Sequence, residues 1–427
     1  MTKQQGILML TSLLLLGSCG GKTNSKGAQD GDAADASETT ESTNKKFDEN
    51  GVEIIDLSDF KLTDAPFPMS EIVDPSDVQY IKLETTDGGL LSQCLKIKVA
   101  ENNVYLADGF LTRYIYQFDR SGKFINKIGK IGQGPGEHKH ISDFTVDNDS
   151  LYATMTERDQ TYVYDKKGNY IRKIGKTKID CSIEKIADKL LFIRRSMCQY
   201  NDFFSFFLLN QSGDSIYCQV PQLVSELINN DKRGFYYQST PITQTKDHIL
   251  LFEALENSLY EISENQYQLR YKLEMGKYSM PLAYVYNINR SKGESIDQYF
   301  KIQGLLETRS DILFLIGYGG DFTIDYIACY NKDNGDVKFW KMAEYQKETV
   351  NSVLYNDIDG GPSIVIRSIL DDPNYVFTLI YPHMAEVYLQ EWRDKTVKYP
   401  EKRSQLCKLL SEMEEDDNPI LVLYKKK

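Results

Sequence analysis

Residues 114–130 read YIYQFDRSGKFINKIGK, and residues 161–176 repeat the pattern as TYVYDKKGNYIRKIGK. Each copy has an apolar or aromatic strand, a polar turn that contains glycine, and a second strand. A third copy spans residues 203–220, and the glycines of the three turns are 46 and 45 residues apart. Short strands that recur every 40–50 residues or so predict the blades of a β-propeller.

Working outward from these copies, the chain divides into units of four strands. In the second unit we expect strands at 143–147, 151–155, 161–165 and 170–175, because Asn, Asp and Gly between them permit tight reversals. Six candidate second strands and six candidate fourth strands occur along the chain. The second strands are expected at 104–108, 151–155, 190–194, 249–254, 312–317 and 375–380. The fourth strands are expected at 80–84, 124–129, 170–175, 215–220, 267–273 and 337–342. These counts predict an all-β fold, a six-bladed propeller of four-stranded antiparallel blades.

The order of the strands predicts how the ring closes. A fourth strand at 80–84 precedes every first strand, and the last third strand, PILVLY, lies at 419–424. We therefore expect N- and C-terminal strands to pair in one closing blade, which leaves only short, protected sheet edges. Helical insertions are expected in the later blades, and residues 383–417 read as two amphipathic helices interrupted near Pro400.

Composition limits the partners of this 427-residue chain. It has 50 Lys and Arg against 62 Asp and Glu, a formal net charge of −12. A phosphate backbone and an anionic lipid surface both attract the opposite charge, so nucleic acid is not expected as a partner. Besides Cys19, six cysteines are expected mostly as buried free thiols, and a hairpin would bring only Cys181 near Cys198.

The N-terminus reads as a targeting signal. The apolar run Ile7–Leu16 is too short to span a bilayer as a helix, and Leu16-Gly17-Ser18-Cys19 has the form of a bacterial lipobox. We expect a signal peptide over 1–18, lipidation of Cys19, a disordered acidic tether over 19–50 with a reach of roughly 30 Å, a lead-in segment over 51–77 and the propeller over 78–427. The predicted location is the cell envelope, on the outer membrane.

A resemblance to a known family supports this reading. Residues 129–152, GKIGQGPGEHKHISDFTVDNDSLY, are similar to an NHL-type repeat. Together with YIKLETTDGGLL at 80–91 and DDNPILVLYKKK at 416–427, they make residues 78–427 resemble the six-bladed β-propeller lipoproteins of Bacteroidetes, a TolB-like group. The resemblance implies the fold and an envelope location rather than an activity.

Strand parity predicts a binding face. Strands alternate in direction within a blade, so loops between second and third strands lie on the same face as connections between blades. That face collects the longer loops, and loops on a rigid scaffold carry most functional sites. Arg and Tyr anchor many interfaces. The candidate binding residues at this face are Arg113, Arg158, Asp159, Arg195, Tyr318 and Asp321.

Two weaker patterns raise the question of metals. His138 and His140 form an H-x-H pair, and parity places His383 on the same face, so these three could ligate zinc. Residues 356–361, NDIDGG, resemble a calcium loop but lack the later ligands of an EF-hand. The glycine-rich turn at 132–136 lacks the Lys and the helix of a phosphate-binding loop. No cofactor is expected, with zinc or calcium as the alternatives.

The function that fits these patterns best is an envelope protein that binds a glycan, a peptide or a protein partner on its loop-rich face. The alternative is a metal-assisted lyase or hydrolase that uses the axial pocket of an NHL-like propeller. A structural role is a third possibility. None of the common nucleophile, zinc-protease or kinase motifs is present, so no catalytic residue is assigned.

Overall fold

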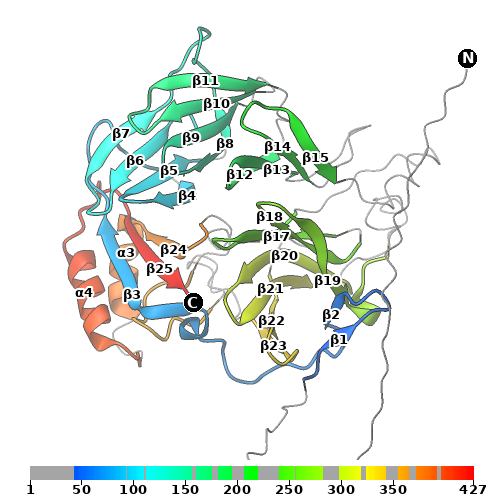
Figure 1. Ribbon diagram of the computed structural model, residues 1–427. Coiled ribbons are helices and arrows are strands. Elements are labelled where there is room, and N and C mark those ends of the chain that lie inside the picture. The colour runs from blue at the N-terminus through cyan, green and yellow to red at the C-terminus, as the bar shows by residue number, and fades with distance from the viewer. Residues whose placement is uncertain are drawn as a thin grey trace, which may run out of the picture. The chain divides into compact units, whose positions relative to one another are not determined.

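The computed structural model describes residues 43–92, 94–109, 112–155, 160–175, 181–194, 206–219, 240–254, 256–281, 298–318, 324–342, 354–364, 372–391 and 396–427. Their strands form six sheets, and each sheet is one blade of a six-bladed β-propeller (Figure 1). Within each blade, neighbouring strands are antiparallel. The predicted fold is therefore confirmed.

The first three blades each contain four consecutive strands, and within each blade the first strand is the inner one. Blade one has β4 (Cys94–Ala100), β5 (Asn103–Asp108), β6 (Ile115–Asp119) and β7 (Phe124–Ile128). Blade two has β8 (Ile141–Val146), β9 (Ser150–Met155), β10 (Gln160–Asp165) and β11 (Tyr170–Gly175). Blade three has β12 (Cys181–Ile186), β13 (Lys189–Arg194), β14 (Phe206–Leu209) and β15 (Ser215–Gln219). The predicted boundaries in these blades hold to within one or two residues.

Blades four and five repeat the arrangement. Blade four has β16 (Ile242–Gln244), β17 (His248–Glu253), β18 (Ser258–Ser263) and β19 (Tyr267–Glu274). Blade five has β20 (Phe300–Glu307), β21 (Asp311–Tyr318), β22 (Tyr326–Asn331) and β23 (Val337–Lys341). A short 3-10 helix, η2 (Gly276–Tyr278), follows β19.

The turns between third and fourth strands share one geometry in blades one to three. In blade one the amide of Gly122 donates to the carbonyl of Asp119, and Gly122 has a φ of 92°. The corresponding glycines of blades two and three are also left-handed, and a bulge follows in each hairpin. Glycine is needed at Gly122 for a second reason, because an added Cβ would lie 2.1 Å from the carbonyl oxygen of Lys82 in blade six.

Blade six joins strands from opposite ends of the chain. Its described strands are β24 (Tyr375–Ile380), β25 (Ile420–Lys426) and β3 (Val73–Lys82), in that order across the sheet. β25 pairs antiparallel with β3, and Val422 lies opposite Tyr80. In Figure 1 the red β25 lies beside the blue β3. The predicted closure between residues 419–424 and 80–84 is confirmed, although β3 begins seven residues earlier than predicted.

Residues 43–72 form a strap along the outer edges of three blades. In the strap, β1 (Lys46–Phe47) pairs with β2 (Glu53–Asp56), and β2 pairs in parallel with β19 of blade four. The strap then contacts Phe339 of blade five and Tyr355, and it enters β3 through the 3-10 helix η1 (Met69–Glu71). From the sequence we expected a disordered tether up to residue 50 and a lead-in segment over 51–77. That boundary is too late, because β1 is already part of a sheet.

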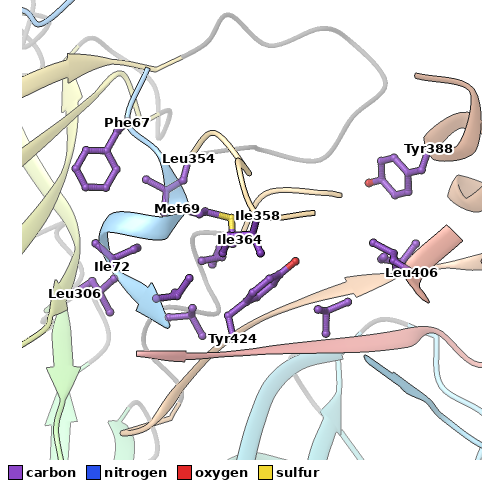
Figure 2. Packing of buried hydrophobic residues seen from close by; sticks show 14 of the residues in the cluster. Phe67, Met69, Ile72, Leu306, Leu354, Ile358, Ile364, Tyr388, Leu406 and Tyr424 are labelled. Carbon is purple, nitrogen blue, oxygen red and sulfur yellow. The ribbon is translucent and has the colours of Figure 1, made fainter. Parts of the chain in front are cut away.

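The two predicted helices pack on blade six. α3 spans Pro382–Glu391, and α4 spans Pro400–Ser411 with proline at its first position, where a missing amide costs no helical hydrogen bond. Figure 2 shows Met69 and Ile72 of the strap, Tyr424 of β25 and Leu406 of α4 lining one buried cluster. The insertion is therefore part of the core of blade six rather than a free lid.

Two further properties of the described residues matter for location and redox state. No helix in the described ranges is long and apolar enough to cross a membrane. The described cysteines are Cys94, Cys181, Cys218, Cys329 and Cys407, and no disulfide joins any two of them. Only Cys181 among them is buried, so the expectation of mostly buried thiols is too strong. Cys198 lies outside the described residues.

Candidate functional site

The loop-rich face predicted from strand parity exists in the structure. Ile141, at the start of β8, donates its amide to the carbonyl of Thr112 in the β5–β6 loop, with a distance of 2.7 Å. Cys94, at the start of β4, donates its amide to the hydroxyl of Tyr381 at the end of β24, with a distance of 3.1 Å. In both contacts a connection between blades meets a loop between second and third strands. We call this side the loop-rich face.

Two of the six candidate binding residues are described, and both lie at this face. Arg113 lies in the β5–β6 loop and is exposed. The main chain beneath it is fixed, because Nε2 of His138 donates to the carbonyl of Arg113 at 3.0 Å. Tyr318 ends β21 and is 37% exposed. The other candidates, Arg158, Asp159, Arg195 and Asp321, lie outside the described residues.

Tyr318 belongs to a cluster of aromatic rings at the junction of blades four and five. Its ring centroid lies 6.2 Å from that of Tyr278, 5.8 Å from that of Phe300 and 6.0 Å from that of Tyr326. Tyr278 and Phe300 are stacked with centroids 4.4 Å apart. Each of these residues begins or ends a strand at the loop-rich face or follows β19 there. Local sequence places each ring at that face, and the packing of blade four against blade five brings them together.

The strap completes this aromatic cluster with Phe60. The ring of Phe60 makes edge contacts with Tyr278, Phe300 and Tyr326, with centroid distances of 5.7, 5.5 and 4.8 Å. Its inner side also meets Phe339, which is buried. Rings that pack edge to face from several segments hold one another in place. Tyr318 is thereby the exposed edge of a rigid aromatic layer. Sequence reasoning missed Phe60 because no repeat includes it.

The amide of Tyr318 adds a polar constraint to the same place. It donates to Oδ2 of Asp325 at 2.5 Å, so the two ends of the β21–β22 loop are joined. The ammonium group of Lys277 lies 5.0 Å from the centroid of Tyr278. The exposed part of the cluster therefore combines aromatic surface with a nearby cation and a carboxylate.

The three histidines suggested as zinc ligands have different environments. His138 is completely buried, His140 is half-buried, and His383 is exposed in the first turn of α3, where its ring stacks on Tyr381. No group of three or more His, Cys, Asp or Glu side chains within the described ranges is placed to hold a metal ion. All three histidines are in those ranges, so they do not form a zinc site in this structure.

The NDIDGG segment at 356–361 forms a polar anchor for the closing blade. The carboxylate of Asp359 accepts hydrogen bonds from the hydroxyl of Tyr80 at 2.5 Å, from Asn356 at 2.8 Å and from the amide of Gly361 at 2.7 Å. Asp357 accepts from Ser70 and pairs with Lys398 at 2.7 Å. These protein donors occupy the oxygens that a calcium ion would need.

The side chain of Glu137 folds back on the glycine-rich turn at 132–136 and bonds to its backbone. The amide of Gly134 donates to the carboxylate of Glu137 at 2.9 Å, and Lys130 pairs with the same carboxylate at 2.7 Å. The amide that a phosphate would use is therefore already bonded. This agrees with the rejection of a phosphate-binding loop.

The inner strands of blades one to three carry a buried ionic cluster that the sequence analysis did not identify. Nζ of Lys96 lies 3.0 Å from Asp143 and 3.0 Å from Glu184, and Nζ of Lys98 lies 2.6 Å from Glu184. Both carboxylates are 2% exposed. We call these four residues the axial cluster. Charged residues alternating with apolar ones in Lys96-Ile97-Lys98 were the available signal.

Asp372 extends the axial cluster toward blade six. Its carboxylate accepts hydrogen bonds from the amides of Val99, Asn374 and Tyr375. Burial raises the pKa of Asp372, while the charge of Lys98 acts in the opposite direction. The ion pairs of the axial cluster join the inner strands of blades one, two and three.

A second ionic group lies on the opposite face, where blades four and five meet. Nε2 of His248 lies 2.7 Å from Glu307, and Lys332 pairs with the other oxygen of Glu307 at 3.0 Å. Burial alone would lower the pKa of His248, but the hydrogen bond and charge of Glu307 more than offset it, so the pKa is raised. Burial would raise the pKa of Glu307, yet His248 and Lys332 hold it below its usual value.

Comparison with known protein families identifies the chain. A family model described as a domain of unknown function, DUF4934, matches residues 52–425. The chain belongs to the DUF4934 family. The match covers every propeller blade and most of the strap, so both are features of a DUF4934 domain.

Two solved structures are similar to this DUF4934 chain, and the first of them agrees with the fold. An inferred exported protein from Bacteroides fragilis is 19% identical and has a TM-score of 0.59, and the match covers 88% of this chain and 99% of that one. A member of the DUF4221 family from Bacteroides vulgatus is 9% identical with a TM-score of 0.44, and the match covers 83% and 97% of the two chains. The first likeness shows the fold alone. No curated protein sequence matches the chain significantly.

Proposed function

We propose that this DUF4934 protein is an exported binding protein of the cell envelope that recognises a partner with the loop-rich face of its propeller. The partner is a glycan, a peptide or an envelope protein. A lipid on Cys19 would anchor the protein in the outer membrane, and the polar segment after it would hold the propeller away from the lipid surface.

The observation that carries this proposal is the aromatic cluster around Tyr318. A tyrosine that is 37% exposed, and whose neighbours are rigidly packed, offers contact area at little entropic cost on binding. Phe300, beneath it, is 2% exposed, so the layer is anchored in the core. Tyr and Arg anchors of this kind contribute most of the energy in many interfaces.

A binding screen with matched variants tests the site. Wild-type protein and the variants Tyr318→Ala and Arg113→Ala would be applied to glycan and peptide arrays, and each hit would be measured by calorimetry. We expect Tyr318→Ala to weaken binding by about tenfold or more, as for a central anchor. Tyr267→Ala is the control, because Tyr267 is 40% exposed but lies on the outer strand β19.

A ligand that binds Tyr318→Ala and Arg113→Ala as tightly as wild type would place the site elsewhere. Equal loss with Tyr267→Ala would indicate a general loss of structure rather than a contact. Thermal melting of all four proteins separates these two outcomes.

The location is tested independently of the ligand. Radiolabelled palmitate should be incorporated into the wild-type protein and not into Cys19→Ala, and the variant should leave the membrane fraction. Cys218→Ala is the matched control, because Cys218 is an exposed cysteine within the folded domain. Incorporation that survives Cys19→Ala would overturn the lipid anchor without affecting the proposed binding face.

A further inference from the structure

The outer edges of the blades are covered unevenly. The strap pairs with β19 of blade four, and the amide of Thr63 donates to the carbonyl of Phe339 in β23 of blade five. Among the described residues, β7, β11 and β15 remain the last strands of their sheets. Each of these carries an exposed isoleucine: Ile125 at 48%, Ile171 at 53% and Ile216 at 43%. Blades one to three therefore present apolar sheet edges.

The covered edge of blade four shows which chemistry pairs with such a strand. β19 is basic, and the strap that covers it is acidic. Lys272 lies 2.6 Å from Asp48, and Arg270 lies 3.3 Å from Glu53. Ile55 of β2 and Leu57, two residues further along the strap, are completely buried. An extended segment with acidic and apolar residues is thus bound by backbone pairing, by ion pairs and by burial.

Of these three edges, β11 is the one that carries two cations, as β19 does. It combines the exposed Tyr170 and Ile171 with two consecutive cations, Arg172 and Lys173. Within the described ranges, neither cation forms an ion pair with a carboxylate. β15, with the sequence SIYCQ, has no basic residue, and the single lysine of β7 lies over the ring of Tyr114.

We propose that the outer edge of β11 binds an extended, acidic segment of a partner protein by strand addition, as β2 binds β19. Strand addition takes its affinity from main-chain hydrogen bonds and its specificity from alternate side chains. In the bound state the acidic side chains pair with Arg172 and Lys173, and apolar side chains cover Ile171. This site is separate from the aromatic cluster of the loop-rich face.

The test uses a fluorescent peptide with the sequence of residues 48–58, DENGVEIIDLS, and the full chain. We expect saturable binding by anisotropy, and protection of residues 170–175 in hydrogen exchange. The double reversal Arg172→Glu with Lys173→Glu should weaken binding by about tenfold or more, because like charges then face each other. A peptide with Lys in place of its Glu and Asp should restore binding to that variant.

Two controls separate strand addition from simple charge attraction. Lys127→Glu, the matched reversal on β7, should leave binding unchanged. A peptide of the same sequence with N-methylated alternate residues should not bind, because it lacks the amide donors that a sheet edge needs.

Several outcomes would overturn the proposal. Protection confined to residues 267–274 would show that the peptide displaces the strap instead. Unchanged affinity of the double reversal would exclude β11, and absence of binding would show that the cations only guard the edge against aggregation. None of these results would bear on the loop-rich face.

Discussion

Glu184 forms ion pairs with both lysines of the axial cluster, Lys96 and Lys98. Loss of its charge therefore affects both lysines. Glu184→Gln should lower the free energy of unfolding by about 3 kcal/mol or more, because Lys96 and Lys98 would each lose a partner while remaining buried. Chemical denaturation monitored by fluorescence measures the change.

Glu101→Gln is the matched control for Glu184→Gln. Glu101 pairs with Lys166 at 2.7 Å, but the two side chains are 50% and 39% exposed. Water screens such a pair, so the control should cost less than about 1 kcal/mol. Equal losses in both variants would show that the axial cluster is solvated and does not hold the inner strands together.

His248 and Glu307 predict a dependence of stability on pH. The raised pKa of His248 means that the folded state holds the proton more tightly than the unfolded state. This contribution is present below the unfolded pKa of His, about 6.5, and is lost as the pH rises through the higher folded value. The lowered pKa of Glu307 contributes stability above the unfolded pKa of Glu, and this contribution is lost as the pH falls through the lower folded value.

The variant His248→Gln isolates the histidine. The difference in melting temperature between wild type and His248→Gln should shrink as the pH rises from about 6 to about 8. Only the wild type has a proton to lose at position 248. His140→Gln provides the comparison on the loop-rich face. A difference that grows over this range would contradict the assignment of the His248–Glu307 pair as charged.

Among the elements, the turn between β6 and β7 locks blade one against blade six. Gly122→Ala should destabilise the protein by about 2 kcal/mol more than Gly109→Ala, since both glycines have positive φ but only Gly122 faces a backbone oxygen. At Gly109 an added Cβ meets nothing within 4 Å. Equal losses of stability in Gly122→Ala and Gly109→Ala would mean that the backbone of β3 moves away from the added Cβ at Lys82 without loss of stability.

The strap depends on Phe60 for its attachment. Phe60→Ala removes a ring that contacts four others and should cost about 2–4 kcal/mol. Limited proteolysis should then cut the strap near residue 60 before it cuts any blade. Phe47→Ala is the control, because Phe47 is 57% exposed and should change neither property. A strap that resists protease in Phe60→Ala would be held by its backbone pairing and not by this ring.

For the molecule as a whole, closure rests on β25, the middle strand of blade six. Removing residues 418–427 would take away the strand between β24 and β3 together with the buried Leu421 and Leu423, and would expose their cluster neighbours Ile81 and Phe377. We expect insoluble protein or a large fall in melting temperature. Removal of residues 46–47 is the control, because it deletes only the exposed strand β1 of the strap. A shortened chain that melts like wild type would disprove this closure.

The blades were predictable because their signals are local and repeated. β11 has the predicted bounds, since Gly168 marks the turn and the alternation of Ile and charged residues marks the strand. Tyr318 was predicted from parity alone. The strap was not predictable in this way, because it lies outside the repeats. Its contacts are also distant in sequence: Arg270 donates to Glu53 across 217 residues. The axial cluster joins three blades, so only tertiary packing reveals it.

The pairing of β25 with β3 also has a consequence in time. Asn418 donates its amide to Thr85 across 333 residues of chain. Synthesis proceeds from the N-terminus, so β25 is made after the other described strands. Until then β3 has an open apolar edge and the ring has a gap. Bringing such distant segments together carries a high entropic cost, and contacts of this kind make folding slow. The ring of blades therefore stays open until β25 has been made and has paired with β3.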